Sequence, residues 1–147
     1  HLGVRLKHNA NRAHIEGKRV ILVDDSIVRG TTSMKIVEMV RNAGAKEVQM
    51  RIAAPPTTDP CFYGIDTPDK DKLLASRYDV AGMAKFIGVD SLAFVSIDGL
   101  YRAMGLPGRN SAEPAFCDAC FTGDYPITLD DVLGVEDRQL SLLVESL

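Results

Sequence analysis

The stretch VILVDDSIVRGTTS, residues 20–33, decides the fold of this chain. Residues 19–23 form a short apolar run rich in β-branched side chains, which predicts a strand buried on both faces. Two adjacent aspartates follow, Asp24 and Asp25, and then a loop with Gly30 and several hydroxyl groups. Adjacent carboxylates repel each other, so a folded chain tolerates them best where a cation or hydroxyl groups share the site. We therefore expect a ligand at this loop.

The segments after the loop complete a βαβ unit. Residues 31–44 place apolar side chains on one helical face, begin with hydroxyl residues suited to capping and end at a glycine. Residues 46–54 read as a second strand, which two prolines end. Strand, helix and strand in this order predict a right-handed parallel crossover, and hence an α/β fold.

Further elements are expected downstream. Thr67 and Pro68 have the residue types of an N-cap and a first helical position, so they predict a helix that runs to Arg77. The remaining pattern predicts a helix over 79–88, a strand over 91–97, a short helix over 98–105, an irregular stretch over 106–128 and a docking helix over 139–147.

The composition describes a globular chain. Its 147 residues are 46% hydrophobic and 25% charged, which argues against disorder and suits one domain or a large part of one. No apolar run approaches the roughly 20 residues of a membrane span, so we expect a soluble cytoplasmic protein that does not contact a membrane. The first residue is His1 rather than Met, which suggests a cut fragment, although tag removal or processing would give the same start.

The charge is unevenly distributed. The net charge is −3, yet residues 1–19 carry five basic side chains and one acidic one. A single phosphate-rich ligand would explain this basic segment. No basic or aromatic stripe continues beyond it, so we do not expect a nucleic-acid partner.

The acidic pair and the loop together favour a phosphorylated sugar. In a parallel sheet, ligands bind beyond the carboxyl ends of the strands, where Asp24 and Asp25 stand. The helix that follows presents free N–H groups, which favour a phosphate. A ribose 5-phosphate offers a phosphate to the loop and hydroxyls to the carboxylates.

Four other kinds of site share part of this pattern. A Walker B strand needs a GxxxxGK[ST] loop and a dinucleotide fold needs GxGxxG, and the chain contains neither. A receiver-type acidic pocket would bind magnesium but has no use for a phosphate loop beside it. A surface Asp-Asp turn would not need the buried strand before it or the Gly-Thr-Thr helix start after it.

Three cysteines remain. Cys117 and Cys120 form a C-x₂-C pair, and Cys61 stands far upstream. An odd count argues against a disulfide framework. The spacing suits half of a zinc site, three ligands of an iron–sulfur cluster or ordinary thiols, and it leaves these open. The three histidines (His1, His8 and His14) belong to the basic segment, and we assign them to solvent.

Residues 20–32 resemble the thirteen-residue phosphoribosyl-pyrophosphate (PRPP) motif of type I phosphoribosyltransferases. From about Leu6 to about Pro126, the chain resembles more particularly the C-terminal part of the amidophosphoribosyltransferase family. The segments that carry this likeness are VDDSIVRGTTS, EMVRNAGAKEV, PPTTDPCFYGIDTP, FIGVDSLAFVSIDGL and CDACFTGDYP.

The resemblance implies a fold and an activity. The fold is part of a type I phosphoribosyltransferase-like parallel sheet with flanking helices over residues 1–105, and an irregular cysteine-bearing region with a tail helix over 106–147. The activity is a glycosyltransfer that makes 5-phosphoribosylamine from PRPP and glutamine-derived ammonia, the first committed step of purine biosynthesis. Purine nucleotides as inhibitors and a homo-oligomer are also implied. The glutaminase domain has no counterpart here, and the first strands of the sheet and the pyrophosphate loop would also lie upstream of His1, so this piece alone is expected to be inactive.

The resemblance also implies residue roles. Asp24 and Asp25 would serve the ribose hydroxyls and Mg²⁺, and Arg5 and Lys7 would end the mobile loop over the pyrophosphate. The 5-phosphate loop would comprise Ser26, Ile27, Val28, Arg29, Gly30, Thr31 and Thr32.

For the cysteines, the resemblance favours a [4Fe–4S] cluster with Cys61, Cys117 and Cys120 as three ligands and a fourth upstream. Since residues 106–128 contain few apolar side chains, we expect their order to depend on that cluster. The alternative to an enzyme segment is a non-catalytic nucleotide-binding regulator with the same type of fold.

Overall fold

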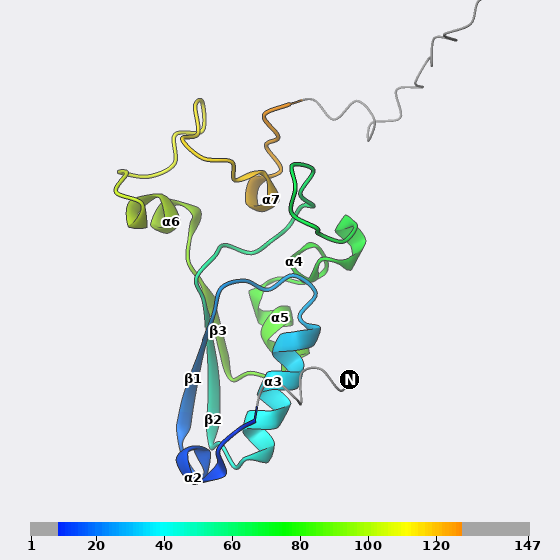
Figure 1. Ribbon diagram of the computed structural model, residues 1–147, viewed down its shortest axis with the longest axis vertical. Helices are drawn as coiled ribbons and strands as arrows, with labels where there is room; N and C mark the ends of the chain where they lie inside the picture. Colours follow the sequence, from blue (N-terminus) through cyan, green and yellow to red (C-terminus); the bar gives the residue numbers. More distant parts are fainter. Residues whose placement is uncertain (1–8, 128–147) are drawn as a thin grey trace, which may run out of the picture.

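The computed structural model describes residues 9–127, and its centre is one parallel sheet (Figure 1). The strands are β1 (Arg19–Asp24), β2 (Glu47–Ile52) and β3 (Ser91–Phe94), in the spatial order β1-β2-β3. Arg19 lies opposite Glu47, and Gln49 lies opposite Ser91, so all three carboxyl ends meet at one edge of the sheet. The predicted α/β fold is confirmed.

Along the chain, helices precede, separate and follow the strands. The helical elements are α2 (Arg12–Ile15), α3 (Thr31–Asn42), the 3₁₀ turn η1 (Lys70–Lys72), α4 (Leu74–Arg77), α5 (Val80–Ile87), α6 (Ile97–Ala103) and α7 (Ala119–Thr122). Figure 1 shows α3 and α5 beside the same face of the sheet, while α6 and α7 lie beyond the carboxyl ends of the strands.

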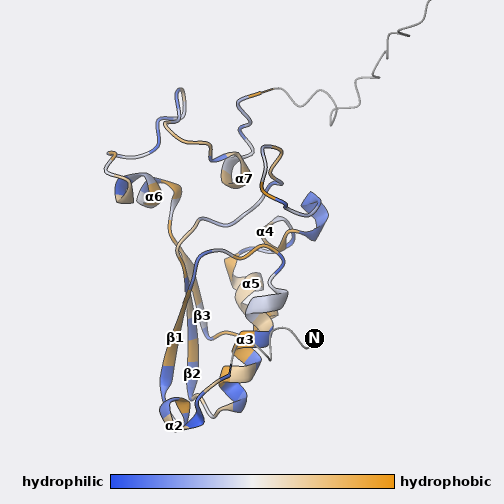
Figure 2. Cartoon of the chain, in the orientation of Figure 1, coloured by the Kyte–Doolittle hydropathy of each residue, from blue (hydrophilic) through white to orange (hydrophobic). Residues whose placement is uncertain are grey.

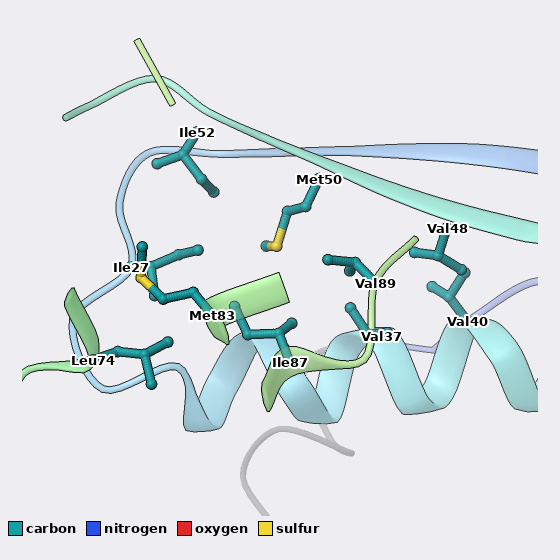
Figure 3. Close-up of a cluster of buried hydrophobic side chains, with 10 residues drawn as sticks. All are labelled: Ile27, Val37, Val40, Val48, Met50, Ile52, Leu74, Met83, Ile87 and Val89. Carbon is teal, nitrogen blue, oxygen red and sulfur yellow. The ribbon is translucent and has the colours of Figure 1, made fainter. Parts of the chain in front are cut away.

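The hydrophobic core lies between that face and the two helices (Figure 3). In β2 every second side chain is buried, which is the period of a strand with one packed face. Figure 3 shows Met50 and Ile52 pointing toward α3 and α5, where they meet Val37, Met83 and Ile87. The core therefore fixes β2, α3 and α5 as one unit directly below the loop after β1.

The prediction that β1 is buried on both faces is wrong for the described residues. Val20 and Leu22 pack against the core, but Ile21 and Val23 are 60% and 76% exposed. Both crossovers run in the same direction across the sheet, and right-handed crossovers of this kind put their helices on the same face. Figure 2 colours much of β1 as apolar, although two of its apolar residues are exposed.

The helix predicted to begin at Thr67 is also wrong. The hydroxyl of Thr67 accepts a hydrogen bond from the backbone N–H of Cys61 at 2.6 Å, so it does not cap a helix. Only the separate short turns η1 and α4 form in this segment. The hydrogen bond closes the loop between Cys61 and Thr67, and the capping pattern of the sequence does not predict this contact.

The other predicted elements are confirmed with small shifts at their ends. The third strand ends at Phe94 rather than at 97, because Ser96 caps α6 with a hydrogen bond from Gly99 N at 3.0 Å. Residues 106–127 are irregular except for α7. The tail helix predicted over 139–147 lies outside the described residues. Within residues 9–127, no helix has the length and apolarity needed to cross a membrane.

Candidate functional site

A cavity of about 510 Å³ opens where β1 ends and α3 begins. Every residue predicted from Asp24 to Thr32 lines it, so the structure brings this whole set together. Ser33, Asp66 and Pro68 complete its lining. Asp66 and Pro68 come from the loop before η1, and no periodicity or capping signal in the sequence relates them to the loop after β1.

The acidic pair forms one wall of the cavity. Asp24 is half-buried and Asp25 is exposed. One oxygen of Asp24 accepts the backbone N–H of Asp25 at 3.0 Å, and one oxygen of Asp25 accepts the Ser26 hydroxyl at 3.1 Å. Within residues 9–127, the other oxygen of each carboxylate accepts no hydrogen bond and is open to a ligand or a cation. One or two carboxylates together with substrate oxygens are the usual ligands of Mg²⁺, so the pair fits that ion.

Another part of the lining is the N-terminus of α3, whose start differs from those of α5 and α6. The side chain of Asp79 caps α5 by accepting Gly82 N at 2.7 Å, and Ser96 caps α6. Helix α3 begins at Gly30 with φ of 75° and has no side-chain cap. Its first residues line the cavity, and within residues 9–127 no side chain caps their N–H groups. Such groups, with the helix dipole behind them, attract an anion.

The loop between the acidic pair and α3 is supported from behind. Ile27 is 3% exposed and its side chain enters the core (Figure 3), so only its backbone can face a ligand. The carbonyl of Val28 accepts the backbone N–H of Leu74, the first residue of α4, at 2.8 Å. The loop is thus held by both the core and α4. The predicted residues Arg5 and Lys7 lie outside the described residues.

The predicted thiols lie away from this cavity, in the irregular region and the loop after β2. Cys61 and Cys120 are half-buried, and Cys117 is exposed. Backbone N–H groups of Tyr63 and Ile65 lower the pKa of Cys61, and the Tyr63 N to Cys61 Sγ distance is 3.4 Å. Burial, and then the neighbouring Cys61, raise the pKa of Cys120.

The thiols do not form a metal site by themselves. Among residues 9–127, no group of three or more His, Cys, Asp or Glu side chains is placed to hold a metal ion. A [4Fe–4S] cluster normally takes four thiolates, and the sequence contains three cysteines. The described residues therefore do not fit this cluster, and its assignment stays a prediction.

Known proteins are similar to this chain in sequence. An amidophosphoribosyltransferase from Rhizobium etli is 64% identical over 146 residues, which are 98% of this chain and 29% of the relative. The Bacillus subtilis amidophosphoribosyltransferase is 52% identical over 124 residues, which are 84% of this chain and 26% of that relative. The chain thus spans less than a third of the length of these relatives. No protein-family model matches it.

Solved structures are similar in fold as well. The glutamine PRPP amidotransferase from B. subtilis, complexed with ADP and GMP, superposes with a TM-score of 0.73 at 46% identity. The match covers 86% of this chain and 29% of that structure. Sequence and fold agree over most of the chain, although the match covers less than a third of each relative. Together they place the chain in the amidophosphoribosyltransferase family.

Proposed function

We propose that this chain is the PRPP-binding segment of an amidophosphoribosyltransferase. The longer protein would transfer the phosphoribosyl group of PRPP to ammonia from glutamine, in the first committed step of purine biosynthesis. The observation that carries the proposal is the single cavity into which both the acidic pair and the uncapped N-terminus of α3 open. The acidic pair suits ribose hydroxyls and a cation, and the helix N-terminus suits a phosphate.

The residues would act by binding and orienting the substrate. The 5-phosphate would accept hydrogen bonds from the N–H groups at the start of α3, because they have no capping acceptor. Asp24 and Asp25 would hold the ribose hydroxyls and orient C1 toward the incoming ammonia. Ammonia is already a nucleophile, so the step needs little general-base assistance. Bound Mg²⁺ would neutralise the charge that develops on the departing pyrophosphate.

Other parts of the proposal concern the longer protein. Arg5 and Lys7 would close over the pyrophosphate, and purine nucleotides would inhibit by competing for the same cavity. The [4Fe–4S] cluster would need a fourth ligand beyond the three cysteines. We further propose that the longer protein is a cytoplasmic homo-oligomer and that this segment alone does not carry out the whole reaction from glutamine, because the glutaminase part is not within it.

Binding can be tested on the chain itself. Titration of the ¹⁵N-labelled chain with ribose 5-phosphate and Mg²⁺ should shift the amide signals of residues 27–33 most. The double variant Asp24→Asn/Asp25→Asn should lose the Mg²⁺-dependent part of this response, while the matched variant Asp71→Asn, which changes an exposed carboxylate on η1, should keep it. Shifts centred on any other segment would contradict the assignment of the cavity.

Catalysis has to be tested in the longer protein. The same double variant should reduce ammonia-dependent synthesis of 5-phosphoribosylamine by more than about tenfold, or 1.4 kcal/mol, while glutamine hydrolysis continues. Turnover within about tenfold of the unaltered protein would show that the pair does not serve the ribose and Mg²⁺. Binding of ribose 5-phosphate without any synthesis by the unaltered protein would favour the regulator instead.

A further inference from the structure

Asp118, the second residue of the CDAC segment, is a buried carboxylate in the described part of the chain. Its side chain is 5% exposed, although it stands in an irregular region with few apolar residues. Arg109, whose side chain is 10% exposed, forms a two-point ion pair with it. The Nε–Oδ2 distance is 2.5 Å and the Nη2–Oδ1 distance is 3.1 Å. Two opposite charges are thus fixed out of water in a defined geometry.

The remaining oxygen lone pairs of Asp118 are also used. The hydroxyl of Tyr101, a residue of α6 that is 2% exposed, lies 2.9 Å from Oδ2. The hydroxyl of Thr122, on α7, lies 3.3 Å from Oδ1. Arg109 in turn reaches Asp124 at 3.0 Å. Burial alone would raise the pKa of Asp118, but the bonds from Arg109 and Tyr101 outweigh it and the pKa lies below its ordinary value.

These contacts connect elements that no strand or long helix connects. Tyr101 belongs to α6, Arg109 to the loop after it, and Asp118 is the residue immediately before α7. The backbone carbonyl of Asp118 also accepts the N–H groups of Phe121 and Thr122, at 2.9 and 3.1 Å. A single buried carboxylate therefore fixes the backbone from which both thiols of the C-x₂-C pair project.

The loop that carries the third cysteine is attached to the same turn. The N–H groups of Thr58 and Asp59 donate to the carbonyl of Cys120 at 3.0 and 3.1 Å. The hydroxyl of Tyr125 donates to the carbonyl of Pro60 at 2.7 Å, and its ring packs edge-on against Phe62 at 5.2 Å. Protein contacts alone therefore hold the loop around Cys61 against α7.

We propose that Arg109, Asp118 and Tyr101 form a clamp that positions Cys117 and Cys120 without a metal ion. In this clamp Asp118 holds the segment through its hydrogen bonds and does not ligate a metal. Arg109 is the positioning residue because it neutralises the buried carboxylate. Removal of one partner from a buried ion pair leaves the other charge uncompensated, so the segment should open when Arg109 is lost. It should stay closed when the thiols are lost.

The test uses this chain, purified with a chelator and a reductant. Hydrogen exchange is read at the amides of residues 58, 59, 121 and 122, which donate the bonds described above. The triple variant Cys61→Ser/Cys117→Ser/Cys120→Ser should keep their protection within about twofold, and Arg109→Met should reduce it by at least about tenfold. Arg102→Met, which changes an exposed arginine on α6, is the matched control and should behave like the unaltered chain.

Two further measurements separate positioning from general stability. Alkylation of the half-buried Cys120 should accelerate in Arg109→Met and less in Arg109→Lys, since lysine keeps the charge but lacks the two-point geometry. The amides of Val37 and Val48 report the core. If Arg109→Met lowers the protection of these core amides as well, the milder variant Tyr101→Phe takes its place. It removes only one hydroxyl, so it should lower the protection of residues 117–123 while the core amides stay protected. Lost protection in the triple serine variant, or unchanged protection and alkylation in both clamp variants, would overturn the proposal.

Discussion

Gly30 has a backbone conformation and a setting that favour glycine. Its φ of 75° lies in the left-handed region, where a side chain costs about 1–2 kcal/mol. A Cβ atom built at this position would lie 2.7 Å from Cδ2 of Leu74 and 3.3 Å from the ring of Phe86. An added side chain would therefore require the buried Leu74 side chain or the loop itself to shift.

The first prediction follows from this contact. Gly30→Ala should destabilise the chain by more than the about 1–2 kcal/mol of left-handed strain, and it should weaken ribose 5-phosphate binding. Gly17→Ala is the matched control, because Gly17 has φ of 72° but no atom within 4 Å of the added Cβ. Urea unfolding and an NMR titration measure the two effects. Equal losses of stability with unchanged binding would mean that the loop does not depend on close contact with α4.

At the scale of elements, one carboxylate joins the far ends of the two core helices to the sheet. Asp90 accepts the backbone N–H of Val48, at the start of β2, at 2.7 Å. It also pairs with Arg41 near the end of α3 at 2.9 Å, and Arg41 donates to the carbonyl of Gly88 after α5 at 2.8 Å. The bond from Val48 and then that from Arg41 hold the pKa of Asp90 below its ordinary value.

The second prediction concerns pH. Because the folded pKa of Asp90 is lowered, its charge stabilises the fold above the ordinary value of about 3.9, and this contribution is lost as the pH falls through the folded pKa. Asp90→Asn should therefore be less stable than the unaltered chain at pH 7, and the difference should disappear in acid. Thermal unfolding across this range measures it, with Asp71→Asn as the control. A difference that stays constant with pH would show that the charge is not responsible.

At the scale of the whole molecule, the hydrophobic core lies on only one face of the sheet within the described residues. The sheet packs against α3 and α5 on one face, and the other face exposes Ile21 and Val23 within the described residues. Substitutions on the two faces should therefore differ in cost even when their chemistry is the same.

The third prediction compares two valines in neighbouring strands. Val48→Thr places a hydroxyl at a site with 0% exposure and should cost about 1–3 kcal/mol. Val23→Thr makes the same change at a site with 76% exposure and should stay within about 0.5 kcal/mol. Urea unfolding of both variants gives the comparison. A comparable cost at Val23 would mean that another part of the protein, or a second copy, covers this face.

The local features of the site could be predicted from the sequence. The strand before Asp24, the loop to Thr32 and helix α3 follow from the period of apolar residues and from turn chemistry, which act between near neighbours. The parallel crossover follows from their order. For the same reason the cap at Asp79 and the end of α5 at Gly88 could be predicted.

The tertiary structure alone decided what depends on residues far apart in the chain. It put Asp66 and Pro68 into the cavity, used Thr67 to close a loop and left one face of β1 open. It also buried Asp118 against Arg109 in a region whose composition suggested little internal support. Local periodicity carries no information on such contacts, because the free energy of a buried ion pair or a packed face depends on which distant groups surround it.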